Sequence, residues 1–320
     1  MSEQTGLTRR QVMAVGAAAL GSAALGGPSL ARAASQTTAG APVSARRRTV
    51  RLAHLTDVHV QPEKAAGEGF AAAMAHMQSQ ADRPDLVLFG GDNVMNVDSA
   101  EGADRAKEQM GVWKTALRNE LSLPHRCCIG NHDILRNHPT DGKKWAIDAL
   151  ELPGRYYHVD QGGWRIVVLD STDPRGDGYK GKLDDEQFEW LDGLLSSTPR
   201  GTHVMVLSHI PILSAAVFFD GDLAEGGDWR VPGSWMHIDA VRIKDLFQKH
   251  ATVRLCLSGH LHLSDHARYN NTWYCCNGAV SGAWWDGAYH ECQTGYGIVD
   301  LFADGTFENR YVTYPWTPRE

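Results

Sequence analysis

Residues 49–59 read TVRLAHLTDVH, an apolar run that ends in two polar side chains, Asp57 and His59. Four later apolar runs end in a similar way, with Gly91-Asp92-Asn93, Gly130-Asn131-His132-Asp133, Ser208-His209 and Gly259-His260-Leu261-His262. Functional sites of α/β proteins form at the carboxyl ends of parallel strands. If the five runs are parallel strands, the sequence predicts one site built from all five segments.

Outward from these motifs, short apolar runs alternate with segments of helical periodicity. We expect strands at residues 49–55, 85–89, 126–129, 156–159, 165–169, 203–207, 252–257, 266–269, 273–276, 297–301 and 306–312. Helices are expected at 70–80, 103–121, 143–150, 184–195 and 238–248. Alternating strands and helices followed by a run of strands predict one α/β layered domain with a mixed sheet over residues 49–320. The long irregular segment Ser214–Trp235 is typical of a functional loop.

The residue types at the strand ends indicate a metal site. Asp, His and Asn supply oxygen and imidazole ligands, and none of the motifs contains Cys. This set suits Mn, Fe or Zn better than a sulfur-rich structural site. Residues i and i+2 face the same way on extended backbone, so Asp57 with His59, and His260 with His262, are each expected to reach one site.

Taken together, the motifs DVH, GDN, GNHD, SH and GHLH resemble the calcineurin-like metallophosphoesterase superfamily over residues 50 to about 265. They are most similar to its bacterial cyclic-nucleotide phosphodiesterase-like branch. The resemblance implies a four-layer α/β/β/α sandwich of two mixed sheets flanked by helices. It also implies that the strand-rich segment 265–320 completes the second sheet.

The resemblance further implies two divalent or trivalent metal ions (Mn, Fe or Zn) that share one bridging carboxylate. The first ion would be held by Asp57, His59, Asp92 and His262, and the second by Asp92, Asn131, His209 and His260. A shared carboxylate and a bridging hydroxide offset the repulsion between two cations about 3.5–4 Å apart. The implied reaction is attack of that hydroxide on a phosphodiester or phosphomonoester, with a phosphodiester favoured.

In the resembled family, the histidine beside the Asn ligand is not a ligand, which makes His132 a general acid for the leaving alkoxide or a donor to a phosphate oxygen. Asp133 is expected to orient the loop or a ligand, or only to form the turn. Many relatives place an Asp three residues after the bridging Asp to orient the acid histidine. Met95 stands at that position here, which leaves Asn93 and Asp98 as candidate substitutes.

Aromatic residues are frequent after His262, and they are candidates for substrate recognition. Trp284 and Trp285 could form a wall for a flat leaving group, with Asn93 as a further substrate contact. The alternative is that these aromatic side chains pack against the second sheet. The stretch GDGYKGK at 176–182 matches G-x-x-x-x-G-K, but Leu183 replaces the required Ser/Thr, so we interpret it as a glycine-rich turn.

The first 33 residues read as an export signal. Arg9 and Arg10 precede a short apolar run, and Ala31-Arg32-Ala33 supplies a cleavage pattern. The paired arginines resemble a twin-arginine signal, so we expect the twin-arginine export machinery as a partner and a periplasmic or secreted location. A short membrane anchor is the alternative. Residues 34–48 read as a flexible lead-in.

Composition excludes several classes of protein. The formal net charge of -7 argues against stable binding to nucleic acid and weakens a nuclease assignment. No membrane association is expected after processing, and the expected substrate is a small phosphoester.

The six cysteines are expected to be buried free thiols, with a bridge at Cys292 as the alternative. Outside the enzymes, a metal-containing sensor or binding protein without turnover remains an alternative.

Overall fold

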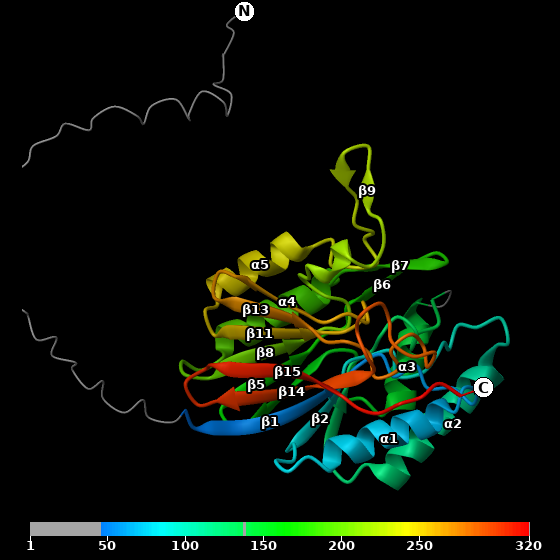
Figure 1. Ribbon diagram of the computed structural model, residues 1–320. Coiled ribbons are helices and arrows are strands. Elements are labelled where there is room, and N and C mark those ends of the chain that lie inside the picture. The colour runs from blue at the N-terminus through cyan, green and yellow to red at the C-terminus, as the bar shows by residue number, and fades with distance from the viewer. Residues whose placement is uncertain (1–45, 137–138, 320) are drawn as a thin grey trace, which may run out of the picture. The chain divides into compact units, whose positions relative to one another are not determined.

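The computed structural model describes residues 46–136 and 139–319 (Figure 1). The predicted export signal at 1–33 and most of the lead-in at 34–48 therefore lie outside the described residues. The first strand, β1, runs from Arg48 to Leu55, so it begins at the last residue of the predicted lead-in. No helix in the described part of the chain combines the length and apolar character that a bilayer crossing needs.

The first sheet has five strands in the order β15-β14-β1-β2-β3. Strand β1 lies at its centre and pairs in parallel with β2 (Leu86–Phe89), which pairs in parallel with β3 (His125–Cys127). On the other side β1 pairs antiparallel with β14 (Gly295–Phe302), and β15 (Phe307–Thr313) closes the edge. Because β1, β2 and β3 are parallel, their carboxyl ends share one edge of the sheet.

The second sheet has six strands in the order β12-β13-β11-β8-β5-β4. Four central strands are parallel, namely β5 (Trp164–Val168), β8 (His203–Leu207), β11 (Val253–Ser258) and β13 (Thr272–Cys276). The edge strands β4 (Tyr157–Gln161) and β12 (Asp265–Tyr269) run antiparallel to their neighbours. Both sheets are therefore mixed, as expected.

The strand-rich C-terminal part is divided between the two sheets. Strands β12 and β13 belong to the second sheet, whereas β14 and β15 extend the first. The expectation that residues 265–320 complete the second sheet is thus wrong for the last two strands. After β13 the chain leaves the second sheet and crosses to the first, where β14 pairs antiparallel with β1 and Ala53 lies opposite Ile298.

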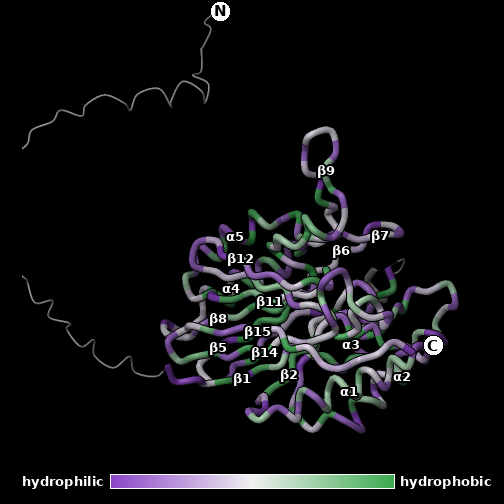
Figure 2. Tube along the Cα trace, viewed as in Figure 1, coloured by the Kyte–Doolittle hydropathy of each residue, from purple (hydrophilic) through white to green (hydrophobic). Residues whose placement is uncertain are grey.

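Helices cover the outer faces of both sheets, which confirms the four-layer α/β/β/α arrangement (Figure 1). Helices α1 (Ala66–Gln78) and α2 (Ala103–Glu120) pack on the first sheet, where Phe70 stacks on Trp113. Helices α4 (Asp185–Ser197) and α5 (Ala240–Lys249) pack on the second, and α3 (Pro139–Leu150) lies beside the β3 end of the first. A third apolar layer, including Leu52, Trp164 and Leu255, fills the space between the sheets. Figure 2 shows the hydrophobic segments along the sheet strands and hydrophilic ones at many turns.

Two small hairpins stand outside the sheets. The GDGYKGK stretch forms the turn and second strand of the hairpin of β6 (Thr172–Arg175) and β7 (Gly178–Gly181), which agrees with a glycine-rich turn. The long segment 214–235 contains a short helix, Ala216–Phe218, and the hairpin of β9 (Ala224–Glu225) and β10 (Asp228–Trp229). Figure 1 shows this second hairpin projecting from the layered body.

All six cysteines are free thiols, and only Cys292 is not buried, so the alternative of a bridge at Cys292 is not realised.

Candidate metal centre

The carboxyl ends of five strands from both sheets meet at one place. The loops after β1, β2 and β3 deliver Asp57, His59, Asp92 and Asn131, while those after β8 and β11 deliver His209, His260 and His262. Groups of these side chains offer donor atoms that lie within 4.8 Å of one another. All seven residues singled out in the sequence are therefore brought together at one site.

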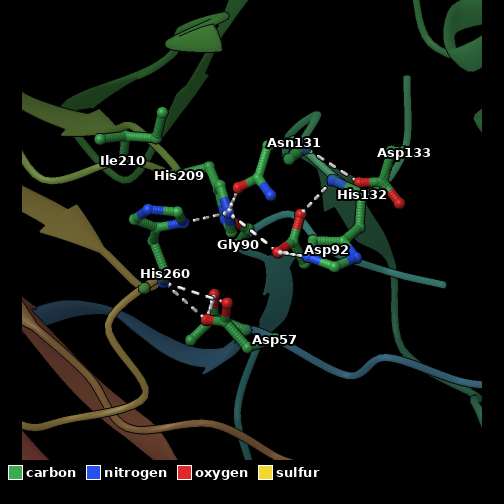
Figure 3. Close-up of polar contacts among 12 residues, drawn as sticks. Asp57, Gly90, Asp92, Asn131, His132, Asp133, His209, Ile210 and His260 are labelled. Atoms are coloured by element: carbon green, nitrogen blue, oxygen red, sulfur yellow. Dashed lines mark hydrogen bonds and ion pairs between the residues drawn. The ribbon is translucent and has the colours of Figure 1, made fainter. Parts of the chain in front are cut away.

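Asp92 lies at the centre of this site (Figure 3). Its Oδ2 atom is 3.3 Å from Nε2 of His209, 3.6 Å from Nε2 of His59 and 4.0 Å from Nε2 of His132. Its Oδ1 atom accepts a hydrogen bond from the backbone N–H of His132 at 2.8 Å. The carboxylate thus contacts both groups of ligands, which is the position a bridging ligand requires.

The first group consists of Asp57, His59 and His262. The two imidazole Nε2 atoms face each other at 3.1 Å, and Nε2 of His262 is 3.5 Å from Oδ1 of Asp57. The second group consists of Asp92, His209 and His260, with Asn131 beside them. Nε2 of His209 is 3.1 Å from Oδ1 of Asn131 and 3.3 Å from Nδ1 of His260 (Figure 3).

The donor atoms fit a cation in each group. Two ring nitrogens 3.1–3.3 Å apart repel each other through their lone pairs unless a proton or a cation lies between them. Burial, together with the charge of His132, holds the pKa of His59 well below its usual range, so a shared proton is disfavoured at that pair. The nitrogen and oxygen donors, with no sulfur, match the predicted choice of Mn, Fe or Zn.

Main-chain carbonyl groups fix the orientation of three imidazole rings. Nδ1 of His209 bonds to the carbonyl of Gly90 at 2.9 Å, and Nδ1 of His262 bonds to that of Gly282 at 2.5 Å. Nε2 of His260 bonds to the carbonyl of Ser234 at 2.9 Å. In each case one nitrogen donates to a carbonyl, which leaves the other nitrogen free as a ligand atom.

The electrostatics of the buried carboxylates also suit cation binding. Burial alone would raise the pKa of Asp92, but the charge of His209 holds it well below the usual range. Burial would lower the pKa of His209, but the adjacent carboxylate raises it to about 9. Burial lowers the pKa of His260 to about 3. The carboxylates are therefore ionised at neutral pH, ready to bind cations in place of protons.

The backbone at the ligands is left-handed, so the expectation of extended backbone in the two i, i+2 pairs is wrong. Positive φ angles occur at five ligand residues, namely Asp57 (54°), His59 (46°), Asp92 (51°), His260 (72°) and His262 (57°). Each such residue costs about 1–3 kcal/mol, and this kind of strain clusters at functional sites. The sharp turns after the strands, rather than the alternation of a strand, make the side chains converge.

Two glycines leave room for the carboxylates. A Cβ atom at Gly130 would lie 2.2 Å from Oδ1 of Asp92, and one at Gly259 would lie 2.2 Å from Oδ2 of Asp57. Any larger residue would displace the ligand. This close approach explains why glycine precedes Asn131 and His260 in the two motifs.

His132 lines the cavity beside the ligands, as expected for a residue that acts on substrate. Its side chain is 29% exposed, and its Nδ1 atom bonds to the main-chain carbonyl of Met95. Asp133 points away into the protein and does not reach the cavity. It accepts hydrogen bonds from the backbone N–H groups of Asn93 and Gly130, both at 2.9 Å, so it positions the loops after β2 and β3.

The structure corrects the expectation for Asn93 and gives Asp98 another partner. Asn93 is fully buried, and its amide donates to Asp133 at 2.9 Å and to the carbonyl of Cys128 at 3.2 Å. It is therefore not a substrate contact. The carboxylate of Asp98 pairs with Arg136 at 3.0 Å, so it is engaged away from His132.

The two adjacent tryptophans play different parts. Trp284 lines the cavity, with its ring centroid 4.6 Å from that of His262. Trp285 is fully buried in the core between α1 and the first sheet, and its Nε1–H donates to the carbonyl of His59 at 3.0 Å. The cap role is therefore possible only for Trp284, and the prediction that Trp285 touches substrate is wrong.

The cavity has a volume of about 260 Å³, and five further side chains line it, namely Tyr179, Asp220, Trp235, Leu261 and Tyr289. Sequence analysis did not single out Tyr179 or Asp220. Tyr179 belongs to the glycine-rich hairpin and Asp220 to the long loop, and neither follows a strand that enters the site. The irregularity of the 214–235 segment was the one signal that pointed toward Asp220.

Both sheets of the four-layer α/β/β/α fold contribute to one buried cluster of Asp and His side chains at their carboxyl edges. A family model described as calcineurin-like phosphoesterase matches residues 50–264, and the chain belongs to this family. The expectation from the five motifs is thereby confirmed for the family.

Two bacterial relatives are cyclic nucleotide phosphodiesterases by description. The chain is 27% identical over 234 residues to a "probable cyclic nucleotide phosphodiesterase" of Synechococcus sp., which covers 67% of this chain and 74% of the relative. It is 26% identical over 221 residues to the 3',5'-cyclic adenosine monophosphate phosphodiesterase CpdA of Pseudomonas aeruginosa, covering 67% and 70%. Among solved structures, a dimetal phosphatase from Danio rerio aligns with a TM-score of 0.57 at 13% identity, over 84% of this chain and all of the other. This last likeness supports the fold alone.

Proposed function

We propose that this protein is an exported, dinuclear-metal phosphodiesterase that uses His132 as its general acid. The observation that carries the proposal is the position of Asp92, whose carboxylate contacts ligands of both groups and lies 4.0 Å from Nε2 of His132. The family match and the similarity to two phosphodiesterases support hydrolysis of a phosphoric ester.

Two ligand sets share Asp92. One consists of Asp57, His59 and His262, and the other of Asn131, His209 and His260. Bound there, divalent or trivalent cations supply Lewis acidity toward phosphate oxygens and lower the pKa of water from 15.7 toward about 7. The chain itself contributes preorganised donors, because main-chain carbonyl groups hold the histidine rings in place.

His132 is placed to deliver a proton to the departing alcohol. The carbonyl of Met95 accepts from Nδ1, so Nδ1 keeps its proton and Nε2 exchanges one with the substrate. In the protonated ring, Nε2–H donates to the leaving oxygen as the P–O bond breaks, and the neutral ring regains the proton from solvent. General acid catalysis of this kind contributes about 10²–10⁴ in rate.

A phosphodiester suits the cavity better than a phosphomonoester. Among the described residues, the cavity lining contains neither lysine nor arginine, so positive charge for a phosphate comes from the bound cations and from protonated His132. A diester carries one negative charge, whereas a monoester carries close to two at neutral pH. Trp284 and Tyr289 border the space in which we place the second alcohol of the diester.

The test compares hydrolysis of bis(4-nitrophenyl) phosphate with that of 4-nitrophenyl phosphate by protein loaded with Mn, Fe or Zn. We expect a higher kcat/KM for the diester. The control is Asp82→Asn, which changes a carboxylate exposed at the surface and should leave both rates unchanged. Protein that binds metal but hydrolyses neither ester would support the alternative, a metal-containing binding protein.

Export by the twin-arginine route is part of the proposal and rests on the sequence alone. Arg9 and Arg10 precede the short apolar run and the Ala31-Arg32-Ala33 pattern. Replacing both arginines with lysine should retain the protein in the cytoplasm, as measured by fractionation of the expressing cells. Processed protein in the periplasm or medium despite that change would rule out this route.

A further inference from the structure

The cavity contains a carboxylate that the proposed reaction does not use. Asp220 lies in the segment between β8 and α5, and its side chain is only 10% exposed. Its Oδ1 atom accepts a hydrogen bond from the hydroxyl of Tyr289 at 2.6 Å. The nearest basic atom in the described part of the chain is Nε2 of His290 at 3.8 Å, which is too far for a hydrogen bond.

A largely buried carboxylate whose one basic neighbour is the imidazole of His290, 3.8 Å away, is costly, because burial removes hydration that a neutral phenol and a distant imidazole only partly replace. Such departures from ordinary packing are expected at functional sites. Asp220 is therefore better explained by a positively charged ligand group than by a structural role. The bond to Tyr289 holds the carboxylate at the cavity while its second oxygen remains free of any partner among the described residues.

Aromatic rings surround the same space. Trp284 and Tyr289 meet edge to face with ring centroids 5.4 Å apart, and Tyr179 and Trp235 complete the aromatic part of the lining. The faces of such rings attract ammonium groups, most strongly where water is excluded. No lysine or arginine among the described residues lines the cavity to compete for the carboxylate. Aromatic faces beside a free carboxylate are the chemistry that recognises an organic cation.

We propose that the cavity binds the ammonium group of an amino alcohol, so that the substrate is a zwitterionic phosphodiester with its phosphate at the metal centre and its cation at Asp220. This rests on the proposed function and specifies the substrate class. Asp220 is then a specificity-determining residue, and Trp284 and Tyr289 supply the aromatic surface. The same carboxylate disfavours substrates with a second negative charge, such as nucleoside polyphosphates.

The test uses binding rather than turnover. Two phosphonates, 2-(trimethylammonio)ethylphosphonate and 3,3-dimethylbutylphosphonate, have nearly the same shape and no ester bond to hydrolyse, and they differ in that the second has a neutral tert-butyl group in place of the trimethylammonium group. Their affinities for the metal-loaded protein are measured by calorimetry. We expect the cationic compound to bind at least about tenfold more tightly in the native protein.

Asp220→Asn keeps the size of the side chain and an oxygen for the Tyr289 hydroxyl, and should bring the affinity ratio close to one. Asp222→Asn is the matched control, because it removes the same charge from an exposed position in the same loop and should preserve the ratio. A thermal melt checks that both variants fold.

Equal affinities in the native protein, or a ratio that Asp220→Asn leaves unchanged, would overturn the proposal and favour a hydroxyl-bearing neutral alcohol. Because neither phosphonate is hydrolysed, the affinity ratio is obtained even if the protein proves to lack phosphodiesterase activity. A tenfold ratio without hydrolysis of any ester would contradict the proposed reaction while supporting the cation site.

Discussion

The imidazole of His132 is held by the main-chain carbonyl of Met95, the residue three positions after Asp92. The resemblance described above implies an Asp at this position, where its side chain would orient the acid histidine. Here the peptide group does the orienting, and the methionine side chain is not needed for it. Neither Asn93 nor Asp98, the two substitutes considered from the sequence, takes the role, because both bind other partners.

His132→Gln is expected to lower kcat by about 10²–10⁴ for alkyl phosphodiesters while leaving metal content unchanged. The loss should be much smaller for 4-nitrophenyl esters, since their leaving group needs little protonation. Steady-state kinetics on both ester types, with elemental analysis of the variant, measures these effects. Loss of metal together with activity would show instead that His132 is a ligand.

Asp98→Asn tests whether the carbonyl of Met95, and not the carboxylate of Asp98, orients the imidazole of His132. The carboxylate of Asp98 pairs with Arg136 and not with His132, so kcat should stay within about twofold of the native value. A loss as large as that of His132→Gln would mean that Asp98 acts on the histidine through a contact that this structure does not contain.

Asp92→Asn is expected to reduce bound metal from about two ions per chain to less than one, because Asp92 contacts ligands of both groups. Asp57→Asn should weaken only one ion, since Asp57 belongs to the group of His59 and His262. Elemental analysis after dialysis distinguishes these outcomes. Equal losses in the two variants would contradict the bridging position of Asp92.

The hydroxyl of Thr56 donates to Oδ2 of Asp57 at 2.6 Å, in a fully buried setting. Thr56→Val preserves the shape of the side chain but removes this donor, and should weaken metal affinity by about 10–100-fold. The measurement is a metal titration against a competing chelator. Thr272→Val is the matched control. Thr272 is the first residue of β13, and its hydroxyl donates to the carbonyl of Val253, the first residue of β11, so the change should leave metal affinity unaffected.

The sequence predicted the positions of the strands but not all of the pairings between them. The central strands were recognisable because their apolar runs are local, and all five strands that carry the motifs lie close to the predicted positions. The sheet to which β14 belongs was not recognisable. Its antiparallel pairing with β1 joins distant parts of the chain, and no local pattern specifies the partner of a buried strand.

The residues of the candidate site also fall into two groups, those that the sequence predicted and those that it did not. Ligands such as Asp92 and His209 could be predicted because each directly follows a strand, and strand ends have a defined place in the fold. Asp220 and Tyr179 reach the cavity from irregular segments, whose paths depend on tertiary contacts. Trp284 and Trp285 are neighbours in sequence, yet one lines the cavity and the other is core, because the left-handed backbone at both residues turns their side chains apart.

Arg51 and Asp300 form a buried ion pair directly across β1 and β14, with hydrogen bonds of 2.7 and 2.6 Å. Asp300→Ala should lower the free energy of unfolding by about 1.5–3 kcal/mol, because it removes two charged hydrogen bonds and leaves the buried guanidinium with only the exposed carboxylate of Asp82. Asp160→Ala, which breaks a similar two-bond pair with Arg165 at the surface, should cost less than about 1 kcal/mol. Urea denaturation of the metal-free proteins gives both values, and equal costs would show that burial does not matter here.

His54 is buried between the sheets, where Asn277 donates to its Nδ1 atom at 2.9 Å and its Nε2 atom has no partner among the described residues. Burial lowers its pKa from 6.5 to about 4. Between these two pH values the unfolded chain binds a proton that the folded protein does not. Stability is therefore lost as the pH falls from about 6.5 to about 4, and the loss attributable to His54 reaches up to about 3 kcal/mol.

His54→Asn should remove this contribution, since asparagine keeps an acceptor for Asn277 and does not titrate. The metal-ligand histidines titrate in both proteins, so the informative quantity is the difference in unfolding free energy between native protein and variant, measured in urea from pH 7.5 to 4. The smaller side chain costs the same at every pH, whereas the His54 contribution shrinks on acidification. The stability advantage of the native protein should therefore decrease by up to about 3 kcal/mol over this range. A difference that stays constant with pH would show that His54 keeps an ordinary pKa in the folded protein.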